Sequence, residues 1–519
     1  MEKNKVNVRS IQKGERSIMA EYLSPGVYVE EFDSGSKPME GVGTSTAGFI
    51  GLAERGPVEG LPQLVTNFSD FKRKYGGYLS ENEYGEYRFL AYAVEHFFIN
   101  GGSRCYISRV APSDAKCAAA QIPSSDNAVL VLTAKNPGMW GNNIRAVISP
   151  ASKAKTQVLE IVENASGKKY VVKNGAGFNP GDVVCFSDGK KNSYNRVIKN
   201  QDNLIEFEKE FEEDVVDKNL VPKKFITTCE FTLEVRYDDQ AEVYENVSFN
   251  IEAPNYIEKK TAKSELITAS CKGSDAEIKA PFNELAGEEA AVVSVSFSDG
   301  SNGSVASLSA ADFIGHDNGA SRRSGIQSFL DNDVVSIMAV PGVTDPNVQL
   351  TLVAHCENLG SRFAVLDMPR EAKKIDDILT HREMFDSTYA ALYHPWLQVF
   401  DPLDKKNFAI PPSGSIMGIY ARSDNSRGVH KAPANEVVRA CVGLDCQFNK
   451  GEQDILNPKG VNLIRAFPGM GIRVWGARTA SSDPSWKYIN VRRLFIFIEE
   501  SIKANTNWAV FEPNDEVLW

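Results

Sequence analysis

The sequence lacks the features by which several large classes of protein are recognised. Its longest apolar runs, such as LFIFI at residues 494–498, fall far short of the ~20 residues that a membrane-spanning helix needs. Residues 1–18 are charged and contain no apolar core of a cleavable signal peptide. We therefore predict no membrane insertion and no secretion through a cleavable signal.

Motifs for nucleotide, metal or covalent chemistry are also missing. The chain has no GxxxxGK[ST] loop, no GxSxG elbow and no HExxH pair, and GVGTST at residues 41–46 lacks the third glycine of a dinucleotide loop. Eight cysteines are scattered without a CxxC pair, which is typical of free thiols in a reducing cytoplasm. Only Cys441 and Cys446 are close enough in sequence to suggest a disulfide. The sequence predicts no cofactor and no metal.

Acidic residues outnumber basic ones, giving a net charge of −11, which argues against general nucleic-acid binding. One segment differs, because residues 460–505 hold seven lysines and arginines against three acidic residues and so carry a charge of +4. A basic face of this kind can hold a reversible contact with an acidic partner. Alternatively, these side chains are solvated or form internal ion pairs, worth about 0–1 kcal/mol each at a surface.

The length of 519 residues predicts several domains, because a single core stops growing at about 250–300 residues. The apolar spacing predicts a helix over 87–98 and a strand over 104–110. Short alternating runs separated by polar clusters predict a β-rich region over 111–290. From 334 onward, strands near 334–340, 362–367 and 390–393 alternate with two helices, the first of which is capped by Asp345 and ended by Gly360, predicting a sheet covered by helices.

A last helix is predicted from the cap Asp483–Pro484 onward. It has an apolar stripe that should pack on the core: Val491, Leu494, Phe495, Ile498 and Ile502. The opposite face, with Arg492 and Glu499, should be exposed to solvent. Arg493 lies at the edge of the stripe and is expected to pair with a carboxylate that the sequence does not identify.

Several motifs in one order resemble a single family. They are LSPGVYVEE at 23–31, TSTAGFIG at 44–51, NPGMWGNN at 136–143, VPGVTD at 340–345, YHPW at 393–396, PPSGSIMGIYARSDNSRGVHKAPANE at 411–436, LNPKGVNLIRAFPGMGIRVWGARTASSDPSWKYINVRRL at 456–494 and FEPNDEVLW at 511–519. The chain thereby resembles the contractile tail sheath proteins of phages, phage-tail-like bacteriocins and contractile injection systems. The weakly matching part, from 151 to about 290, lies where these proteins carry insertions of varying size.

The resemblance implies an α+β multidomain fold. Residues 1–18 would be an extension. Residues 19–39 would form an arm and strand that complete a mixed α+β C-terminal domain at 401–519, the inner domain facing the tube. Residues 40–110 with 291–400 would form an α/β middle domain, and 111–290 a β-rich outer inserted domain. The strand residues expected to pair with a neighbouring subunit are Val27, Tyr28, Val29 and Glu30; the alternative is a strand within its own domain.

The implied function is mechanical. Subunits would polymerise around an inner tube and contract to drive it through a target envelope, as a tail component assembled in the bacterial cytoplasm. The expected partners are the chain itself, the inner tube protein, and baseplate and tail-terminator proteins. The residues expected to face the tube are Arg465, Arg473, Arg478, Lys487 and Arg492.

Two alternatives remain at this stage. Another phage tail component, of baseplate or tube, would share the setting but not the full order of motifs. An α/β hydrolase is less favoured, although Asp367 at a strand end has Cys356, His355, His381 and His394 near it in sequence.

In the family pattern FEPNDEVLW is followed by a further helix and arm, so we expect a chain that ends at Trp519 to polymerise weakly, either as a short variant or because a C-terminal segment is absent.

Overall fold

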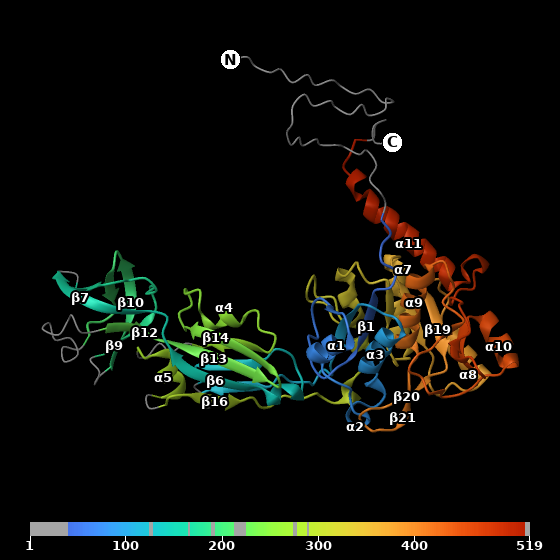
Figure 1. The fold of residues 1–519 in the computed structure, drawn as a ribbon, viewed down its shortest axis with the longest axis horizontal. Coiled ribbons are helices and arrows are strands. Elements are labelled where there is room, and N and C mark those ends of the chain that lie inside the picture. The colour runs from blue at the N-terminus through green and yellow to red at the C-terminus, as the bar shows by residue number, and fades with distance from the viewer. Residues whose placement is uncertain are drawn as a thin grey trace, which may run out of the picture. The chain divides into compact units, whose positions relative to one another are not determined.

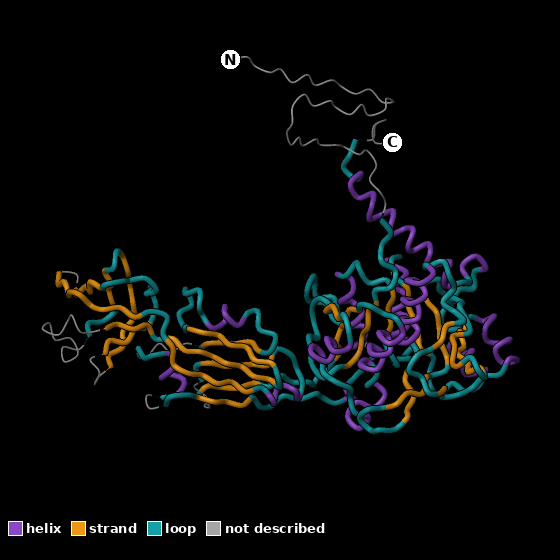
Figure 2. Tube along the Cα trace, in the orientation of Figure 1, coloured by secondary structure: helices purple, strands orange, loops and turns teal. Residues whose placement is uncertain are grey.

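A computed structural model describes residues 40–513 except 124–127, 165–166, 188–191, 212–224, 273–277 and 288–289. The predicted extension, the arm and the strand at 27–30 lie outside the described residues, as does Trp519. Residues 41–519 form one compact unit by their internal contacts. Helices and strands both contribute substantially to this unit (Figure 2).

A nine-stranded sheet is the largest element of the fold (Figure 1). In order across the sheet its strands are β2 (Gln63–Val65), β3 (Cys105–Val110), β1 (Ala47–Leu52), β17 (Ile337–Ala339), β18 (Phe363–Asp367), β19 (Ala390–His394), β24 (Val461–Phe467), β25 (Gly471–Val474) and β22 (Glu436–Val437). The six strands from β3 to β24 are parallel. β2 and β25 run antiparallel to them, and β22 pairs antiparallel with β25. Every residue of β1, β18 and β19 is buried. Such continuous apolar strands are typical of a parallel sheet covered on both faces.

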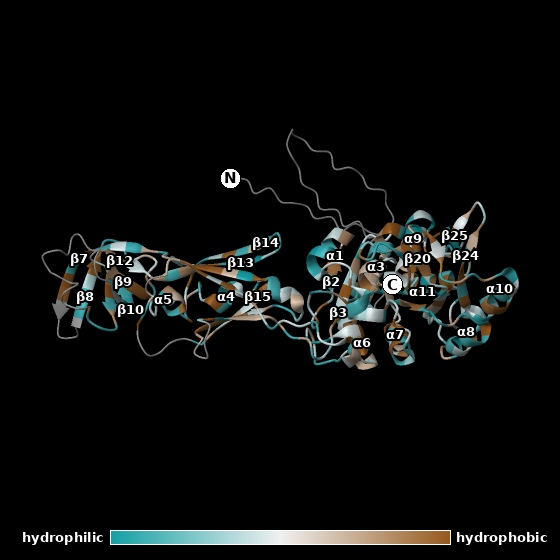
Figure 3. Ribbon diagram, turned by 90° about the horizontal axis from the view of Figure 1, so that it is seen from below, coloured by the Kyte–Doolittle hydropathy of each residue, from teal (hydrophilic) through white to brown (hydrophobic). Residues whose placement is uncertain are grey.

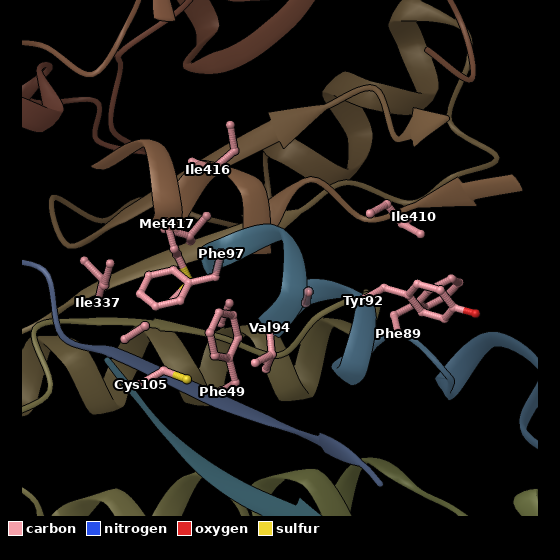
Figure 4. Close-up of a cluster of buried hydrophobic side chains, with 14 of the residues drawn as sticks. Phe49, Phe89, Tyr92, Val94, Phe97, Cys105, Ile337, Ile410, Ile416 and Met417 are labelled. Atoms are coloured by element: carbon pink, nitrogen blue, oxygen red, sulfur yellow. The ribbon is translucent and has the colours of Figure 1, made fainter. Parts of the chain in front are cut away.

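The two faces of this sheet carry two separate cores, because successive strand residues point in opposite directions. Phe49 belongs to one core, whereas its neighbour Ile50 belongs to the other. On the first face α3 (Leu90–Asn100) packs on α9 (Ser413–Arg427), and a Cβ on Gly414 would lie 2.3 Å from the carbonyl oxygen of Ala93. Figure 4 shows the aromatic and aliphatic side chains that fill this layer.

The second face is covered by α7 (Pro346–Leu359), with α6 (Ala310–Ile314), α8 (Ile375–Arg382) and α10 (Lys450–Leu456) contributing to the same core. Helix α7 begins and ends as the sequence predicts. The carboxylate of Asp345 accepts hydrogen bonds from the amides of Asn347 and Val348, and Gly360 adopts the left-handed conformation at φ 68°.

The region between β3 and α6 is almost entirely β-structure. A four-stranded antiparallel sheet contains β14 (Gln240–Val247), β13 (Glu230–Tyr237), β6 (Arg145–Ala151) and β16 (Val293–Ser296), and a three-stranded sheet contains β15 (Ile267–Cys271), β5 (Leu130–Ala134) and β4 (Ala119–Ile122). Two short helices, α4 (Ile257–Thr261) and α5 (Pro281–Ala286), contribute to the core of these sheets. Apolar and polar residues mix along these strands (Figure 3).

A small closed barrel is inserted between β6 and β13. It consists of β10 (Asn192–Gln201), β11 (Leu204–Phe207), β8 (Gly167–Val172), β7 (Lys155–Asn164), β12 (Phe225–Thr228) and β9 (Val183–Ser187). Its interior is a packed core of aromatic and branched residues, including Tyr170, Phe186 and Phe207. The chain is thus a mixed α/β protein of several sheets with a small barrel, which is the coarse form of the predicted fold class.

The remaining elements border the large sheet. They are α1 (Phe68–Tyr75), α2 (Glu81–Tyr84), a small sheet of β21 (Asn407–Ile410), β20 (Leu397–Phe400) and β23 (Gly443–Leu444), and the final helix α11 (Ile489–Thr506). A 3₁₀ turn at Pro484–Trp486 precedes α11, so the predicted cap at Asp483 begins this turn and not the helix itself. All eight cysteines are free thiols, so the structure does not contain the disulfide considered for Cys441 and Cys446.

Candidate functional site

The carboxyl ends of the parallel strands are where an α/β enzyme would hold its catalytic groups. Asp367, at the end of β18, is fully buried there. Its carboxylate accepts hydrogen bonds from the amide of Gly342 (3.1 Å) and from the amide and hydroxyl of Ser413 (2.8 and 2.7 Å). Burial raises the pKa of Asp367 to about 6 despite these bonds. The side chain thus holds the first turn of α9 and a loop together and is closed to a substrate.

The other residues considered for catalysis also have structural partners. His355 contacts the guanidinium of Arg362 at 3.2 Å, His381 contacts Gln349 at 2.9 Å, and His394 lies 3.7 Å from the sulfur of Cys446. Burial lowers the pKa of all three imidazoles to about 4. Neutral, buried histidines held in this way are packing residues, and the geometry gives the hydrolase alternative no nucleophile, base and open site together.

A doubly wound sheet normally binds its ligand in the crevice where the strand order reverses. In this sheet the order reverses beside β1, which pairs with β3 on one side and β17 on the other. The loop after β17 packs tightly against Phe89: a Cβ on Gly342 would lie 2.5 Å from the ring of Phe89. Phe89 in turn packs edge-on against Trp396, with ring centroids 5.1 Å apart. Aromatic packing therefore fills the place where such a sheet would bind a ligand.

The basic segment predicted from the sequence includes the hairpin of β24 and β25. Arg465 and Arg473 lie directly opposite each other on this hairpin. Arg465 donates to the side chain of Gln453 (3.0 Å) and stacks on Phe467, while Arg473 donates to Asn435 and to the carbonyl of Met470. Within the described residues neither guanidinium has a carboxylate at ion-pair distance. Like charges directly opposite are unfavourable, so this pair leaves positive charge available to a partner.

The two following basic residues extend this surface. Arg478 stacks on Tyr488, 5.6 Å from the ring centroid, and both line a hollow of about 420 Å³ together with Trp475 and Asn435. Lys487 is partly exposed on the turn before α11. We name Arg465, Arg473, Arg478 and Lys487 the basic surface. That it faces a tube remains a prediction.

Arg492, the fifth residue expected to face the tube, is buried instead. Its guanidinium lies 3.6 Å from the ring centroid of Trp486 and 4.4 Å from that of Tyr389, and it donates to the hydroxyl of Tyr389 at 3.2 Å. These cation–π contacts hold the first turn of α11 against the sheet. This position argues against a tube contact for Arg492.

The structure reverses the predicted orientation of α11. Phe495, Ile498 and Ile502 are between 41% and 49% exposed, whereas Arg492, Arg493 and Ile496 are buried. The helical spacing was correct, but the stripe that it defines does not face the core. Periodicity cannot distinguish an inward stripe from an outward one when arginines occupy the inner face. The exposed stripe is an apolar surface next to the basic surface in sequence.

Sequence reasoning expected a carboxylate partner for Arg493 but could not name it. The partner is Asp424 in the last turn of α9, with nitrogen–oxygen distances of 2.9 and 2.5 Å and side chains only 4% and 3% exposed. Thr44 joins them, donating its hydroxyl to Asp424 at 2.7 Å and accepting from Arg493 at its carbonyl at 2.8 Å. We name Thr44, Asp424 and Arg493 the clasp.

The described part of the chain contains no group of three His, Cys, Asp or Glu residues placed to hold a metal ion. Among its helices, none has the length and apolarity that crossing a bilayer requires. The candidate sites that remain on this fold are surfaces, chiefly the basic surface and the exposed stripe of α11.

Comparison with known proteins finds similarity to one family over part of the chain. Residues 324–480 match the model of the phage tail sheath protein central domain. The chain is 27% identical over 220 residues to the tail sheath protein of Salmonella phage ViI, covering 37% of this chain and 34% of the relative. It is 25% identical over 215 residues to that of Escherichia phage P2, covering 39% and 53%. The chain thus spans about a third to a half of the length of these relatives.

One solved structure shares the fold along most of the chain. It is the crystal structure of a sheath tail protein from Listeria innocua, with a TM-score of 0.50, 10% sequence identity, and coverage of 92% of this chain and 81% of that one. By these matches the chain is similar to phage tail sheath proteins, most clearly over residues 324–480. The relatives are named as tail sheath proteins, which agrees with the prediction of a sheath protein that is not an enzyme.

Proposed function

We propose that the chain is the sheath subunit of a contractile phage tail or injection system. Subunits polymerise around an inner tube in an extended lattice, then repack into a shorter and wider one, which drives the tube through a target envelope. The match of residues 324–480 to the sheath central domain carries this proposal, because that stretch supplies β17, β18, β19, β24, β25 and β22 of the large sheet.

The partners that we propose are further copies of the chain, an inner tail tube protein, and baseplate and tail-terminator proteins, with no nucleic acid and no membrane insertion. Particles would assemble in the bacterial cytoplasm. The division into an N-terminal arm at 19–39 joined to an inner domain at 401–519, a middle domain at 40–110 with 291–400, and an outer domain at 111–290 belongs to the same proposal. Val27, Tyr28, Val29 and Glu30 would add a strand to a neighbouring subunit.

The basic surface is the part that we assign to the tube. Arg465 and Arg473 oppose each other without a described carboxylate partner, in a chain whose net charge is −11. An acidic surface on the tube would relieve this repulsion and could still release during contraction, because an exposed ion pair is weak and screened by salt. The contact would therefore be reversible.

Electron microscopy of the purified chain at high concentration tests the proposal. Hollow striated tubes with a wide lumen are the expected result. Narrow tubes or flat rings would contradict it and indicate a tube or baseplate component, whereas closed small oligomers would reopen the enzyme alternative.

Co-assembly with the cognate tube protein tests the basic surface. The double variant Arg465→Gln/Arg473→Gln should weaken tube binding at least tenfold and reduce its dependence on salt. Arg236→Gln is the matched control, because Arg236 is an exposed arginine in the β-rich region and pairs with Glu234 in its own strand. Equal binding by the double variant and the control would refute the assignment of this surface.

A further inference from the structure

The clasp joins three segments that are far apart in sequence. Arg493 lies in the second turn of α11, Asp424 lies in the last turn of α9, and Thr44 lies just before β1. The guanidinium of Arg493 and the carboxylate of Asp424 form a bidentate ion pair, the geometry that gives the strongest ion pairs. An acidic residue in the last turn of a helix is unfavourable to the helix dipole, so Asp424 does not serve the stability of α9 itself. Its buried position serves the contact with Arg493 and Thr44.

A second polar contact connects the same segments. The amide of Val42 donates to the hydroxyl of Ser501, two turns further along α11, at 3.2 Å. Residues 42–44 are therefore bound to α11 at two points, through Thr44 near its start and through Val42 near its middle.

Close packing also contributes where Gly41 lies against α11, since a Cβ on Gly41 would lie 2.7 Å from the ring of Phe497, but it does not fill the whole space between the segments. A hollow of about 280 Å³ lies between the same segments and is lined by Val42, Val335, Ile496 and Phe497 among others. Protein interiors seldom leave a space of this size between elements that must stay together, because the lining atoms lose their contacts across it. Hydrogen bonds and the ion pair thus hold residues 42–44 to α11 around this hollow.

We propose that Thr44, Asp424 and Arg493 are positioning residues that make residues 42–46 and α11 move as one body. The chain continues from residue 42 toward the N-terminus, and α11 presents the exposed stripe of Phe495, Ile498 and Ile502. A displacement applied to either segment would reach the other through the clasp. The coupling itself does not depend on the proposed function. Its purpose does rest on the proposed function, because the coupling would connect two attachments of one subunit during contraction.

Hydrogen exchange of the full-length chain tests the coupling directly. Arg493→Gln, a change in α11, should speed exchange of the amides of residues 42–47 at least tenfold as well as those of the first turns of α11. Thr44→Val removes one hydrogen bond and should give a smaller change in the same two segments, which keeps the test valid if Arg493→Gln folds poorly. Faster exchange in α11 alone, with residues 42–47 unchanged, would overturn the proposal.

A matched control separates this coupling from general loosening. Asp182 is 1% exposed and forms an ion pair with Lys153 at 2.7 Å within the β-rich region. Asp182→Asn should alter exchange around β7 and β9 and leave residues 42–47 and α11 unaffected. Faster exchange of residues 42–47 in this control would show that any lost buried ion pair loosens them, and would also overturn the proposal.

Assembly supplies a readout that a merely structural role would not affect. Arg493→Lys keeps the positive charge but loses the second hydrogen bond to the carboxylate. Where the unaltered chain forms tubes, this variant should recover more of the melting temperature lost in Arg493→Gln than of the tube formation. Restoration of both to the same degree would count against a positioning role. If the unaltered chain stays monomeric, as weak polymerisation of a chain that ends at Trp519 would allow, the exchange measurement on the subunit alone decides the coupling, whereas narrow tubes or rings would count against the proposed function.

Discussion

The nine-stranded sheet region and the β-rich region at 111–299 differ in the kinds of side chain that they bury. The first buries charged and titratable groups, including Arg362, Asp367 and the clasp, and gives each a defined partner. Among the described residues, the second consists of small sheets and a barrel and buries fewer such groups, chiefly Asp182 and Glu230, which both pair with Lys153. Buried polar networks specify one arrangement at the risk of a large loss when a partner is removed. The sheet region is therefore the part in which geometry matters most, and the family match at 324–480 falls within it.

Acidification should produce the largest difference between the two regions. Burial lowers the pKa of His96, His355, His381 and His394 to about 4, and no histidine lies between residues 111 and 299. A base whose folded pKa lies below its ordinary value of 6.5 stabilises the fold above pH 6.5 and loses that contribution as the pH falls toward 4. We expect each imidazole to cost about 1–2 kcal/mol of unfolding free energy at pH 5 relative to pH 7.

Denaturant unfolding at pH 7 and pH 5, followed by hydrogen exchange in both regions, measures this effect. Asp367 offsets part of it, because its raised pKa favours the folded state in acid and disfavours it as the pH rises through 6. His430→Ala is the control, since its side chain is exposed and should leave the pH dependence unchanged. A β-rich region that loses as much stability as the sheet region would break the comparison.

Two glycines with nearly the same positive φ provide a second test of the comparison, with an effect of intermediate size. Gly342 in the sheet region and Gly287 in the β-rich region have φ of +77° and +80°, but only Gly342 lies against another side chain, that of Phe89. Gly342→Ala should lower the unfolding free energy by about 3 kcal/mol, since strain and overpacking add. Gly287→Ala should cost about 1 kcal/mol from strain alone. Thermal unfolding of both variants measures the difference, and equal losses would show that packing around Phe89 can relax.

Removal of the barrel should have the smallest effect on the sheet region. Ala151 and Glu230 are paired neighbours at the end of β6 and the start of β13, so a two-residue turn can replace residues 153–228. Glu230 should be changed to Gln in the same chain, because it would lose its partner Lys153. We expect the main calorimetric transition to shift by no more than about 1 °C, which corresponds to about 1 kcal/mol or less for a chain of this size. A chain that fails to fold would show that the two regions depend on each other.

Local sequence signals predicted individual elements well. The cap at Asp345, the following Pro346 and the stop at Gly360 define α7 to the residue, because these signals act within one or two turns. The apolar run at 362–367 likewise corresponds to β18. These features depend on neighbours in sequence and need no knowledge of the fold.

Contacts between residues far apart in the sequence were harder to predict. The spacing of Val491 to Ile502 predicted a helix correctly but its orientation wrongly, because stacking of Arg492 on Trp486 and Tyr389 replaces the apolar contacts that a buried face usually makes. The partner of Arg493 lies 69 residues away, and Thr44 lies 449 residues away. No periodicity links residues at such separations. The basic surface was found by counting charge, but the direct opposition of Arg465 and Arg473 required the strand register.

The pairing of β1 with β17 also imposes a delay on formation of the sheet during synthesis. β1 and β3 are made early, but β17, the other neighbour of β1, begins 227 residues after β3 ends. At about 5–20 residues per second, the ribosome needs roughly 10–50 s to supply it. During that interval the free edge of β1 is open to any other strand, including that of another nascent copy. A chaperone that shields this edge during synthesis would raise the yield of folded subunits without any influence on their final stability.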